Sequence, residues 1–300
     1  MSTFIAISFS GLALGAIYFL VASGLSLIYG LMEVLNFAHG AFLTVGAYAA
    51  WVTATHLPAS VSAPQRFLVA VVVAVLAGAV IAGATEVALI RPLYRRPVSQ
   101  ILVTVGLDLV VVALLLGVFG SNSQAVPVPS WLAGATRLGP EILPNADFVA
   151  LGAGAAVLLS LVWFLGHARY GLIIRAGVEN RDMVAALGIN VRRAFTLVFV
   201  IGGAAAGLAG ILNSVVFSGA LVSPTQGDSL LIFAFIVVVI GGLGSLWGSA
   251  LAAVMVGMLQ DYVSFYAGTG GLAQMGSISV VLLLAVVLLV RPSGLMGAAR

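Results

Sequence analysis

Residues 3–32, TFIAISFSGLALGAIYFLVASGLSLIYGLM, contain no aspartate, glutamate, histidine, lysine or arginine. A helix of about 20 apolar residues is long enough to cross a bilayer, and this stretch exceeds that length. It lacks the basic start, short apolar core and cleavage site of a signal peptide. We therefore predict a first transmembrane helix that is retained.

The rest of the chain has the same membrane-like composition. Of its 300 residues, 62% are hydrophobic and 7% are charged, whereas about a quarter of the residues in a soluble domain are charged. Cysteine is absent from the sequence, which excludes disulfides, thiol catalysis and thiolate metal sites. We expect a protein of the lipid bilayer with no metal, no cofactor and no nucleic-acid partner.

Polar breaks divide the chain into apolar segments. These lie near 4–30, 34–55, 67–90, 98–120, 148–166, 195–218, 229–246, 249–266 and 271–290. We predict an all-α polytopic protein with eight or nine transmembrane segments in a single domain over residues 1–300. No segment outside the membrane is long enough to form an enzyme.

The arginines indicate the orientation. Three stretches hold Arg91, Arg95, Arg96, Arg169, Arg175, Arg181, Arg192, Arg193, Arg291 and Arg300, while the stretches on the opposite side hold Arg66 and Arg137. Basic residues concentrate on the cytoplasmic side of membrane proteins. We therefore expect a cytoplasmic C-terminus and an external loop over 121–147, with a short helix around Trp131.

Six ionisable side chains lie in or near the apolar segments, namely Glu33, His39, Glu86, Asp108, Asp228 and Asp261. Charges at bilayer depth are costly, so each is a candidate functional residue. For Glu86 we expect an ion pair with Arg91, for Asp228 a helix cap, and for Asp261 an interfacial position. Asp108 is centred in its segment, where it is either a buried partner contact or a pathway residue.

The stretch VLNFAHGAFLTVGAYAA, 34–50, places polar groups in apolar, glycine-rich sequence. On a helix Asn36, Gly40 and Thr44 share one face, with His39 beside it. One interpretation is a close helix crossing in which Asn36 and His39 bond to carbonyl groups. The other is a broken helix that lines a transport path, because the other half has a second glycine-rich interruption, GGLGSLWG at 241–248. We predict broken helices in both halves.

The segment 167–194 holds the most charges. It predicts a short amphipathic helix from about 178 to 187, ended by Gly188. Such a helix between two spans is suited to a groove on a cytoplasmic partner.

Two motifs resemble a known family. NFAHGAFLTVGAY, 36–48, and RAGVENRDMVAALGINVRRAFTLVFVIGGAAAGLAGIL, 175–212, resemble the membrane permeases of branched-chain amino acid ABC importers, in the hydrophobic amino acid uptake permease family. The likeness is closest to the smaller of the two paired permeases, the LivH type. The spacing of Glu86, Arg91 and Pro92 and the stretch 241–253 fit as well.

The resemblance implies a transport subunit of the bacterial inner membrane that is not itself an enzyme. It implies a second permease, two cytoplasmic ATP-binding subunits and a periplasmic substrate-binding protein as partners, and the chain has no phosphate-binding loop of its own. The segment 167–194 then corresponds to a coupling segment that contacts an ATPase through Glu179, Asn180, Arg181, Asp182, Ala186, Leu187, Gly188 and Ile189. We expect a translocation path near Glu33, Asn36, His39, Gly40, Thr44 and Asp108.

Other readings remain open at this level. Permeases for urea and short-chain amides have nearly the same signature. A proton-coupled secondary transporter could use Glu33, His39 and Asp108 as a relay, since histidine titrates in the physiological range. An intramembrane enzyme is disfavoured because His39 has no catalytic partner in the sequence.

Overall fold

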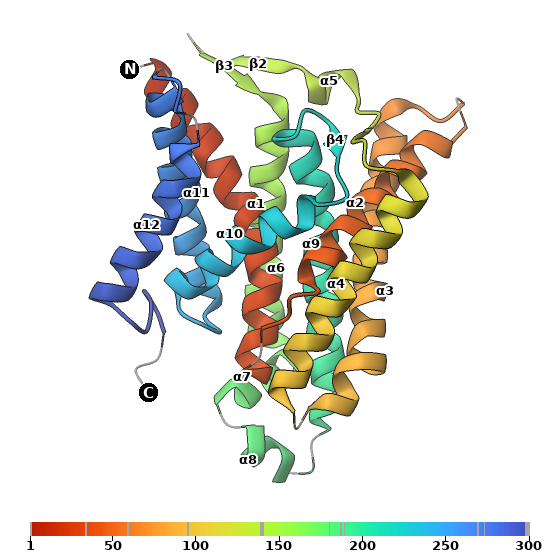
Figure 1. Cartoon of the computed structure of the whole chain (residues 1–300), viewed down its shortest axis with the longest axis vertical. Coiled ribbons are helices and arrows are strands. Elements are labelled where there is room, and N and C mark those ends of the chain that lie inside the picture. Colours follow the sequence, from red (N-terminus) through yellow and green to blue (C-terminus); the bar gives the residue numbers. More distant parts are fainter. Residues whose placement is uncertain are drawn as a thin grey trace.

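The computed structural model describes residues 2–297 except 34, 59, 95, 139–140, 180, 187, 189, 269 and 273. For residues 2, 138, 178–179, 181–182 and 185 only the backbone is described. The chain folds into a mostly helical body in which long helices run between an upper and a lower end (Figure 1).

Each predicted apolar segment contains a helix. These are α1 (Ser2–Met32), α2 (His39–His56), α3 (Ala63–Thr85), α4 (Pro97–Phe119), α6 (Asn145–His167), α9 (Val191–Val216), α10 (Gln226–Gly241), α11 (Leu246–Gly268) and α12 (Met275–Val290). Among the described residues, six helices are long and apolar enough to cross a membrane: α1, α3 with its continuation to Leu93, α4, α6, α9 and α11. The shorter apolar helices α10 and α12 and the helix α2 are outside that set. The count of eight or nine crossings and the broken membrane helices remain predictions.

A proline determines how α3 ends. The helix widens into a π-helical turn over Glu86–Ile90 and closes with a 3₁₀ turn over Arg91–Leu93. Pro92 has no N–H group to donate and its ring collides with the preceding turn, so a regular helix cannot continue through it. Pro97 then occupies the first turn of α4, where a missing N–H group costs nothing.

The upper end carries the predicted external loop. The short helix expected around Trp131 is present as α5 (Ser130–Ala133). It is followed by a hairpin of β2 (Ala135–Leu138) and β3 (Glu141–Pro144), which the sequence analysis did not predict. Strand β1 (Gln124–Ala125) pairs with β4 (Leu221–Val222) and thereby ties this loop to the end of α9.

Small residues hold the central helices together. A Cβ atom built on Gly207 of α9 would lie 2.2 Å from the Ala74 carbonyl oxygen of α3, and one built on Gly24 of α1 would lie 2.6 Å from the Cα of Gly202. Only glycine allows backbones to approach this closely, and in lipid such packing replaces the missing hydrophobic driving force. The helix α9 therefore lies in the core between α1 and α3.

The two glycine-rich interruptions meet in space. Residues 33 and 35–38 separate α1 from α2, and residues 242–245 separate α10 from α11. A Cβ atom built on Gly244 would lie 3.1 Å from the Cα of Gly30. The two halves of the chain are therefore in contact at these turns.

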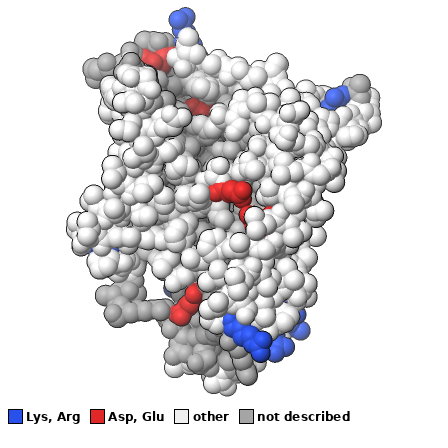
Figure 2. Space-filling model, in the orientation of Figure 1, with Lys and Arg blue, Asp and Glu red and all other residues white. Residues whose placement is uncertain are grey.

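Basic side chains are distributed unevenly along the long axis. Basic side chains gather at the lower end of the face in Figure 2, by the lower ends of α3 and α4 in Figure 1, the end at which α7 (Arg169–Glu179) and α8 (Arg181–Ala186) also lie. Acidic side chains lie near mid-height, toward the upper end and also in the lower part of this face, and a few basic side chains lie at its upper end. The larger basic patch at the lower end is what the expected orientation predicts for the cytoplasmic side.

Candidate functional site

Helix α1 stops at a residue with unusual backbone geometry. Glu33 has a φ of 55°, in the left-handed region, and its N–H donates to the carbonyl of Tyr29 at 2.7 Å. This arrangement closes the last turn of a helix in the way that glycine more often does. The chain then turns, and α2 begins at His39, within the body of the molecule rather than at its end (Figure 1).

His39 and Thr44 lie inside the helix packing. The imidazole of His39 is fully buried, its Nε2 lies 3.1 Å from the carbonyl oxygen of Val21, and its Cε1 lies against Gly24. The hydroxyl of Thr44 donates to the carbonyl of Gly40 in the same helix at 3.1 Å. Around these two residues the structure has the close helix crossing that was one of the two interpretations of this stretch.

Asn36 is in a different environment. Only 4% of its surface is exposed, yet neither atom of its amide group has a hydrogen-bond partner among the described residues. It borders a cavity of about 10 Å³, together with Gln100 and Thr104 of α4. A buried polar group without a partner is costly and calls for an explanation. The cavity is too small to admit an amino acid in this conformation.

Asp108 meets an acid from the other half of the chain. Its carboxyl group lies beside that of Asp228 in the first turn of α10 and near the backbone N–H of Ala41, while its buried Oδ1 has no hydrogen-bond partner among the described residues. The predicted cap role of Asp228 is wrong, because Thr225 occupies the cap position of α10 and makes no side-chain cap bond.

Two glycines bring these acids together. A Cβ atom built on Gly227 would lie 2.2 Å from the carbonyl oxygen of Gly40, so α2 and α10 touch at their first turns. A Cβ atom built on Gly40 would lie 3.3 Å from the Oδ1 of Asp108. The structure thus joins Gly40, Thr44 and Asp108 of the predicted path in one junction near mid-height.

The predicted pair of Glu86 and Arg91 is confirmed. The fully buried Glu86 lies 3.0 Å from Arg91 and accepts hydrogen bonds from the hydroxyls of Thr196 and Tyr94. Burial and the neighbouring Glu86 carboxylate raise the pKa of Tyr94. This cluster links the lower end of α3 to the start of α9, directly after the segment 167–194.

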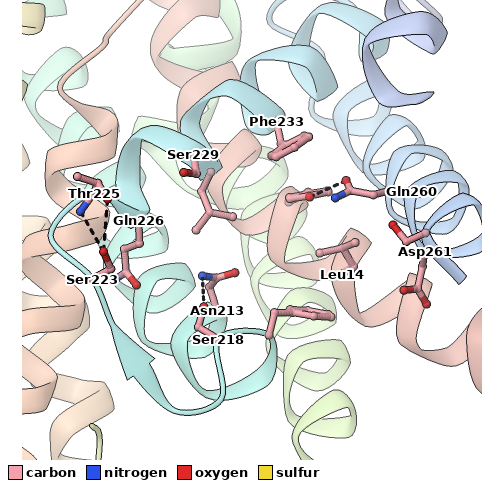
Figure 3. A pocket seen from close by; sticks show the side chains of 14 residues that line it. Leu14, Asn213, Ser218, Ser223, Thr225, Gln226, Ser229, Phe233, Gln260 and Asp261 are labelled. Carbon is pink, nitrogen blue, oxygen red and sulfur yellow. Dashed lines mark hydrogen bonds between the residues drawn. The ribbon is translucent and has the colours of Figure 1, made fainter. Parts of the chain in front are cut away.

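A polar pocket opens on the other side of α10. It has a volume of about 460 Å³ and lies between α1, α10, α11 and the end of α9 (Figure 3). Its polar lining includes Asn213, Gln226, Ser229 and Gln260, and Asp261 also contributes to it. This pocket has no signal in the sequence, because its side chains come from distant segments of the chain. Asp261, expected at the interface, is half-buried and lines this pocket.

The segment 167–194 contains helices, but not in one piece. The predicted helix from 178 to 187 corresponds to the end of α7 and to α8. Gly188 has a φ of 77°, consistent with its predicted role in ending the helix. Asn180, Leu187 and Ile189 lie outside the described residues, as do the side chains of Glu179, Arg181 and Asp182. Ala186 is exposed, and no set of three or more metal-binding side chains is found in the part of the chain that the structure describes.

Comparisons with known proteins identify similar sequences over nearly the whole chain. The family model for the permease component of the branched-chain amino acid transport system matches residues 7–291. The high-affinity branched-chain amino acid transport system permease protein LivH of Salmonella typhimurium is 29% identical, over 96% of this chain and 94% of that protein. BraD of Pseudomonas aeruginosa, described in the same words, is 26% identical with the same coverage.

A more distant likeness covers part of the chain. The ribose import permease protein RbsC of Escherichia coli is 30% identical over 57% of this chain and 48% of that protein. No solved structure gives a significant match to this chain.

Proposed function

This chain belongs to the family of branched-chain amino acid transport system permease components, and from that membership we propose that it is the membrane permease of an ATP-driven importer for leucine, isoleucine, valine or related amino acids. The observation that carries the proposal is the family match over residues 7–291. The permease acts in the bacterial inner membrane, with its C-terminus in the cytoplasm. A second permease of the same family completes the path, and a periplasmic binding protein delivers the substrate.

Energy comes from two cytoplasmic ATP-binding subunits. The chain has no G-x-x-x-x-G-K-[ST] sequence with which to hold a nucleotide phosphate. Helix α8 is the proposed docking element, because it is short, lies at the arginine-rich end and exposes Met183 to 62%. The full docking set comprises Glu179, Asn180, Arg181, Asp182, Ala186, Leu187, Gly188 and Ile189.

The force from the ATPases reaches the membrane helices through a short route. Helix α8 is followed within a few residues by α9, whose first turns include Thr196, a partner of Glu86. Helix α9 in turn packs against α1 and α3 at glycines, where the backbones are in direct contact. Movement of α8 is therefore expected to displace α9 and the helices packed against it as a unit.

The proposed translocation path passes the junction of Gly40, Thr44 and Asp108, where α2 and α10 touch. Its proposed residues are Glu33, Asn36, His39, Gly40, Thr44 and Asp108. Asp108 with Asp228 and the unpartnered amide of Asn36 supply polar groups at depth, where a zwitterion needs them. His39 takes part by fixing α2 against α1, since its ring is enclosed by the packing.

Co-purification tests this proposal. The chain is isolated gently from its native membrane, and its partners are identified by mass spectrometry. We expect a second permease and two ATP-binding subunits, and we expect the ATP-binding subunits to be lost when Glu179 and Asp182 are both changed to Arg. A matched variant changes Glu141 of the external hairpin to Arg and should keep them. Recovery of the chain without ATP-binding subunits, together with ATP-independent transport in liposomes, would contradict the proposal.

The carboxyl pair gives a second candidate some support. Neighbouring carboxyl groups at bilayer depth, as in Asp108 and Asp228, are a feature of the proton relays of secondary transporters. That candidate predicts that uptake survives the loss of the ATP-binding subunits and stops when a protonophore collapses the proton gradient. The importer predicts that uptake stops in the first case.

A further inference from the structure

Thr196 joins the start of α9 to the end of α3. Its hydroxyl oxygen lies 2.7 Å from the Glu86 carboxylate and 3.0 Å from the carbonyl oxygen of Arg192 in its own helix. The hydroxyl has one proton, and the shorter bond to the ionised acceptor is the stronger of the two. The Nη2 group of Arg91 donates to the same hydroxyl oxygen at 2.8 Å and to Glu86 at 3.0 Å. Thr196 is therefore held by both members of the ion pair.

A ring contact strengthens the same connection. Tyr94, which follows the 3₁₀ turn, donates to Glu86, and its ring meets the ring of Phe195 edge-on at a centroid distance of 5.0 Å. The carboxylate of Glu86 is fully buried, so separation from its partners would leave a buried charge uncompensated, which is costly. The turn at 91–94 and the start of α9 are therefore expected to move together.

The connection continues into α4. Gln100, in the first turn of that helix, is 2% exposed, and its Nε2 donates to the carbonyl of Leu93 at 2.8 Å. Leu93 is the last residue of the 3₁₀ turn. Of the described residues of α4, only Gln100, Thr104 and Val111 are buried, and a Cβ atom added to Gly106 would meet nothing within 4 Å. Side chains, rather than close backbone contacts, therefore hold the start of α4.

The last step reaches the turn that holds Asn36. Thr104 lies one helical turn beyond Gln100, on the same face of α4, and its hydroxyl oxygen accepts from the N–H group of Phe37 at 3.3 Å. Gln100 and Thr104 also border the small cavity beside Asn36. Contacts therefore run from Thr196, through the 3₁₀ turn and the start of α4, to the turn between α1 and α2.

We propose that these contacts form a linkage that carries the movement of α9 to the turn around Asn36, with Thr196 and Gln100 as positioning residues that couple ATP hydrolysis to transport. This inference rests on the proposed function and adds to it the route from the ATPase end to the path. Neither positioning residue belongs to the proposed path or to the docking set. Hydrogen-bonded side chains between rigid helices are the kind of network through which two distant sites influence each other.

The number of ATP molecules hydrolysed per leucine transported measures this coupling. The importer is reconstituted in liposomes with its co-purifying partners and its binding protein, and uptake of radiolabelled leucine and release of phosphate are followed in the same sample. Thr196→Val keeps the shape of the side chain but removes the hydroxyl that Glu86 and Arg91 contact. We expect this variant to raise the ratio of ATP to leucine by at least about threefold, within the range that residues of such networks produce.

Two further variants separate coupling from folding. Thr196→Ser restores the hydroxyl and should return the ratio of ATP to leucine to that of the wild type. Thr85→Val makes the same chemical change one residue before Glu86, at a hydroxyl that donates to the carbonyl of Ile81 in its own helix. Because that bond joins no two helices, Thr85→Val should have the wild-type ratio.

A second pair of variants tests the step into α4. Gln100→Leu removes the donor to Leu93 and is expected to raise the ratio of ATP to leucine in the same way. Its match is Gln124→Leu, which removes an amide that donates to the carbonyl of Phe119 at the other end of α4 and should have the wild-type ratio. Thr196→Val and Gln100→Leu each decide the question if the other does not assemble.

A wild-type ratio in the assembled Thr196→Val or Gln100→Leu complex would overturn the inference. This includes the case in which uptake and hydrolysis fall in parallel, because a merely structural loss lowers both. An equal rise in Thr85→Val or Gln124→Leu would overturn it as well. All of these results leave the importer standing, whereas the proposed function itself fails if the wild-type protein shows no ATP-dependent uptake of leucine.

Discussion

Glu86 shows how a charge is accommodated at the lower end of a membrane helix. Its carboxylate is fully buried but has Arg91, Thr196 and Tyr94 as partners. The two members of the ion pair differ in access to water, since 34% of the Arg91 side chain is exposed. Removing Arg91 therefore leaves a buried charge without its partner, whereas removing Glu86 leaves a charge that water can reach.

We predict that Arg91→Ala destabilises the protein more than Glu86→Ala does. The first change leaves a buried carboxylate without its cation, which costs about 3 kcal/mol or more. The second leaves an arginine that can turn to water and two hydroxyl groups, of Thr196 and Tyr94, that each lose an acceptor, with no charge left buried. Thermal unfolding of the detergent-purified variants measures the difference, and the opposite order would show that Glu86 is not held by its charge.

Asn36 and His39 are adjacent in the motif but differ in their hydrogen bonding. We predict that Asn36→Leu leaves the melting temperature unchanged or raises it, because it removes a buried polar group that has no partner. It should nevertheless lower transport. In the conformation that admits the substrate, the proposed path needs the Asn36 amide as a polar group. Uptake and thermal unfolding are measured on the same preparation. Normal transport by this variant would remove Asn36 from the path.

The matched change His39→Leu is expected to destabilise the protein by about 1 kcal/mol, the typical contribution of one hydrogen bond. The bond that it removes is the contact between His39 Nε2 and the carbonyl of Val21. A fully stable His39→Leu variant would contradict the role of this residue in fixing α2 against α1.

At the scale of elements, contacts between glycines determine how the helices pack. Many helices here are apolar on all sides, so no single stripe identifies the face that meets a neighbour. Small residues in α9 mark that face instead, because only they permit backbone contact. Gly203 approaches α3 in this way, whereas Gly106 of α4 has nothing within reach of an added Cβ atom.

We predict that Gly203→Ala destabilises the protein by about 2 kcal/mol or more, because its Cβ atom would lie 2.3 Å from the carbonyl oxygen of Gly78. Gly106→Ala makes the same chemical change in open space and should stabilise α4 by up to about 1 kcal/mol through its higher helix propensity. Unfolding in a denaturing detergent compares the two. Equal free energies of unfolding for the Gly203→Ala and Gly106→Ala variants would show that α3 and α9 can move apart to accept the added methyl group.

At the scale of the whole molecule, charge and topology agree. The larger basic patch of the face in Figure 2 lies at one end, and the loop with its hairpin lies at the other (Figure 1). The natural chain has no cysteine, so a single introduced cysteine reports its own side of the membrane.

We predict that Ser123→Cys, in the external loop, reacts with a membrane-impermeant maleimide in intact spheroplasts. Ser293→Cys, near the C-terminus, should react only after the membrane is opened. Both serines are exposed, so the comparison reports on topology rather than on burial. Labelling of both cysteines in intact spheroplasts would place the C-terminus outside and contradict the orientation.

The sequence by itself determined the class of the protein, its apolar segments, the separation of its arginines and the motifs of its family. These properties depend on the composition of the chain or on residues that are neighbours in it. They can therefore be predicted without knowing which helices pack against each other. The ion pair of Glu86 with Arg91 was predictable for the same reason, since its two residues are close in the chain.

Only the tertiary structure decided which polar groups share a site. Asp228 lies beside Asp108, and Gln226 and Leu14 line one pocket, across large separations in the chain. Neither contact could be predicted, because helices that are apolar on all sides give no periodic signal of their neighbours. The physical reason is that glycine contacts and helix ends, rather than a hydrophobic stripe, set the arrangement of the helices in this protein.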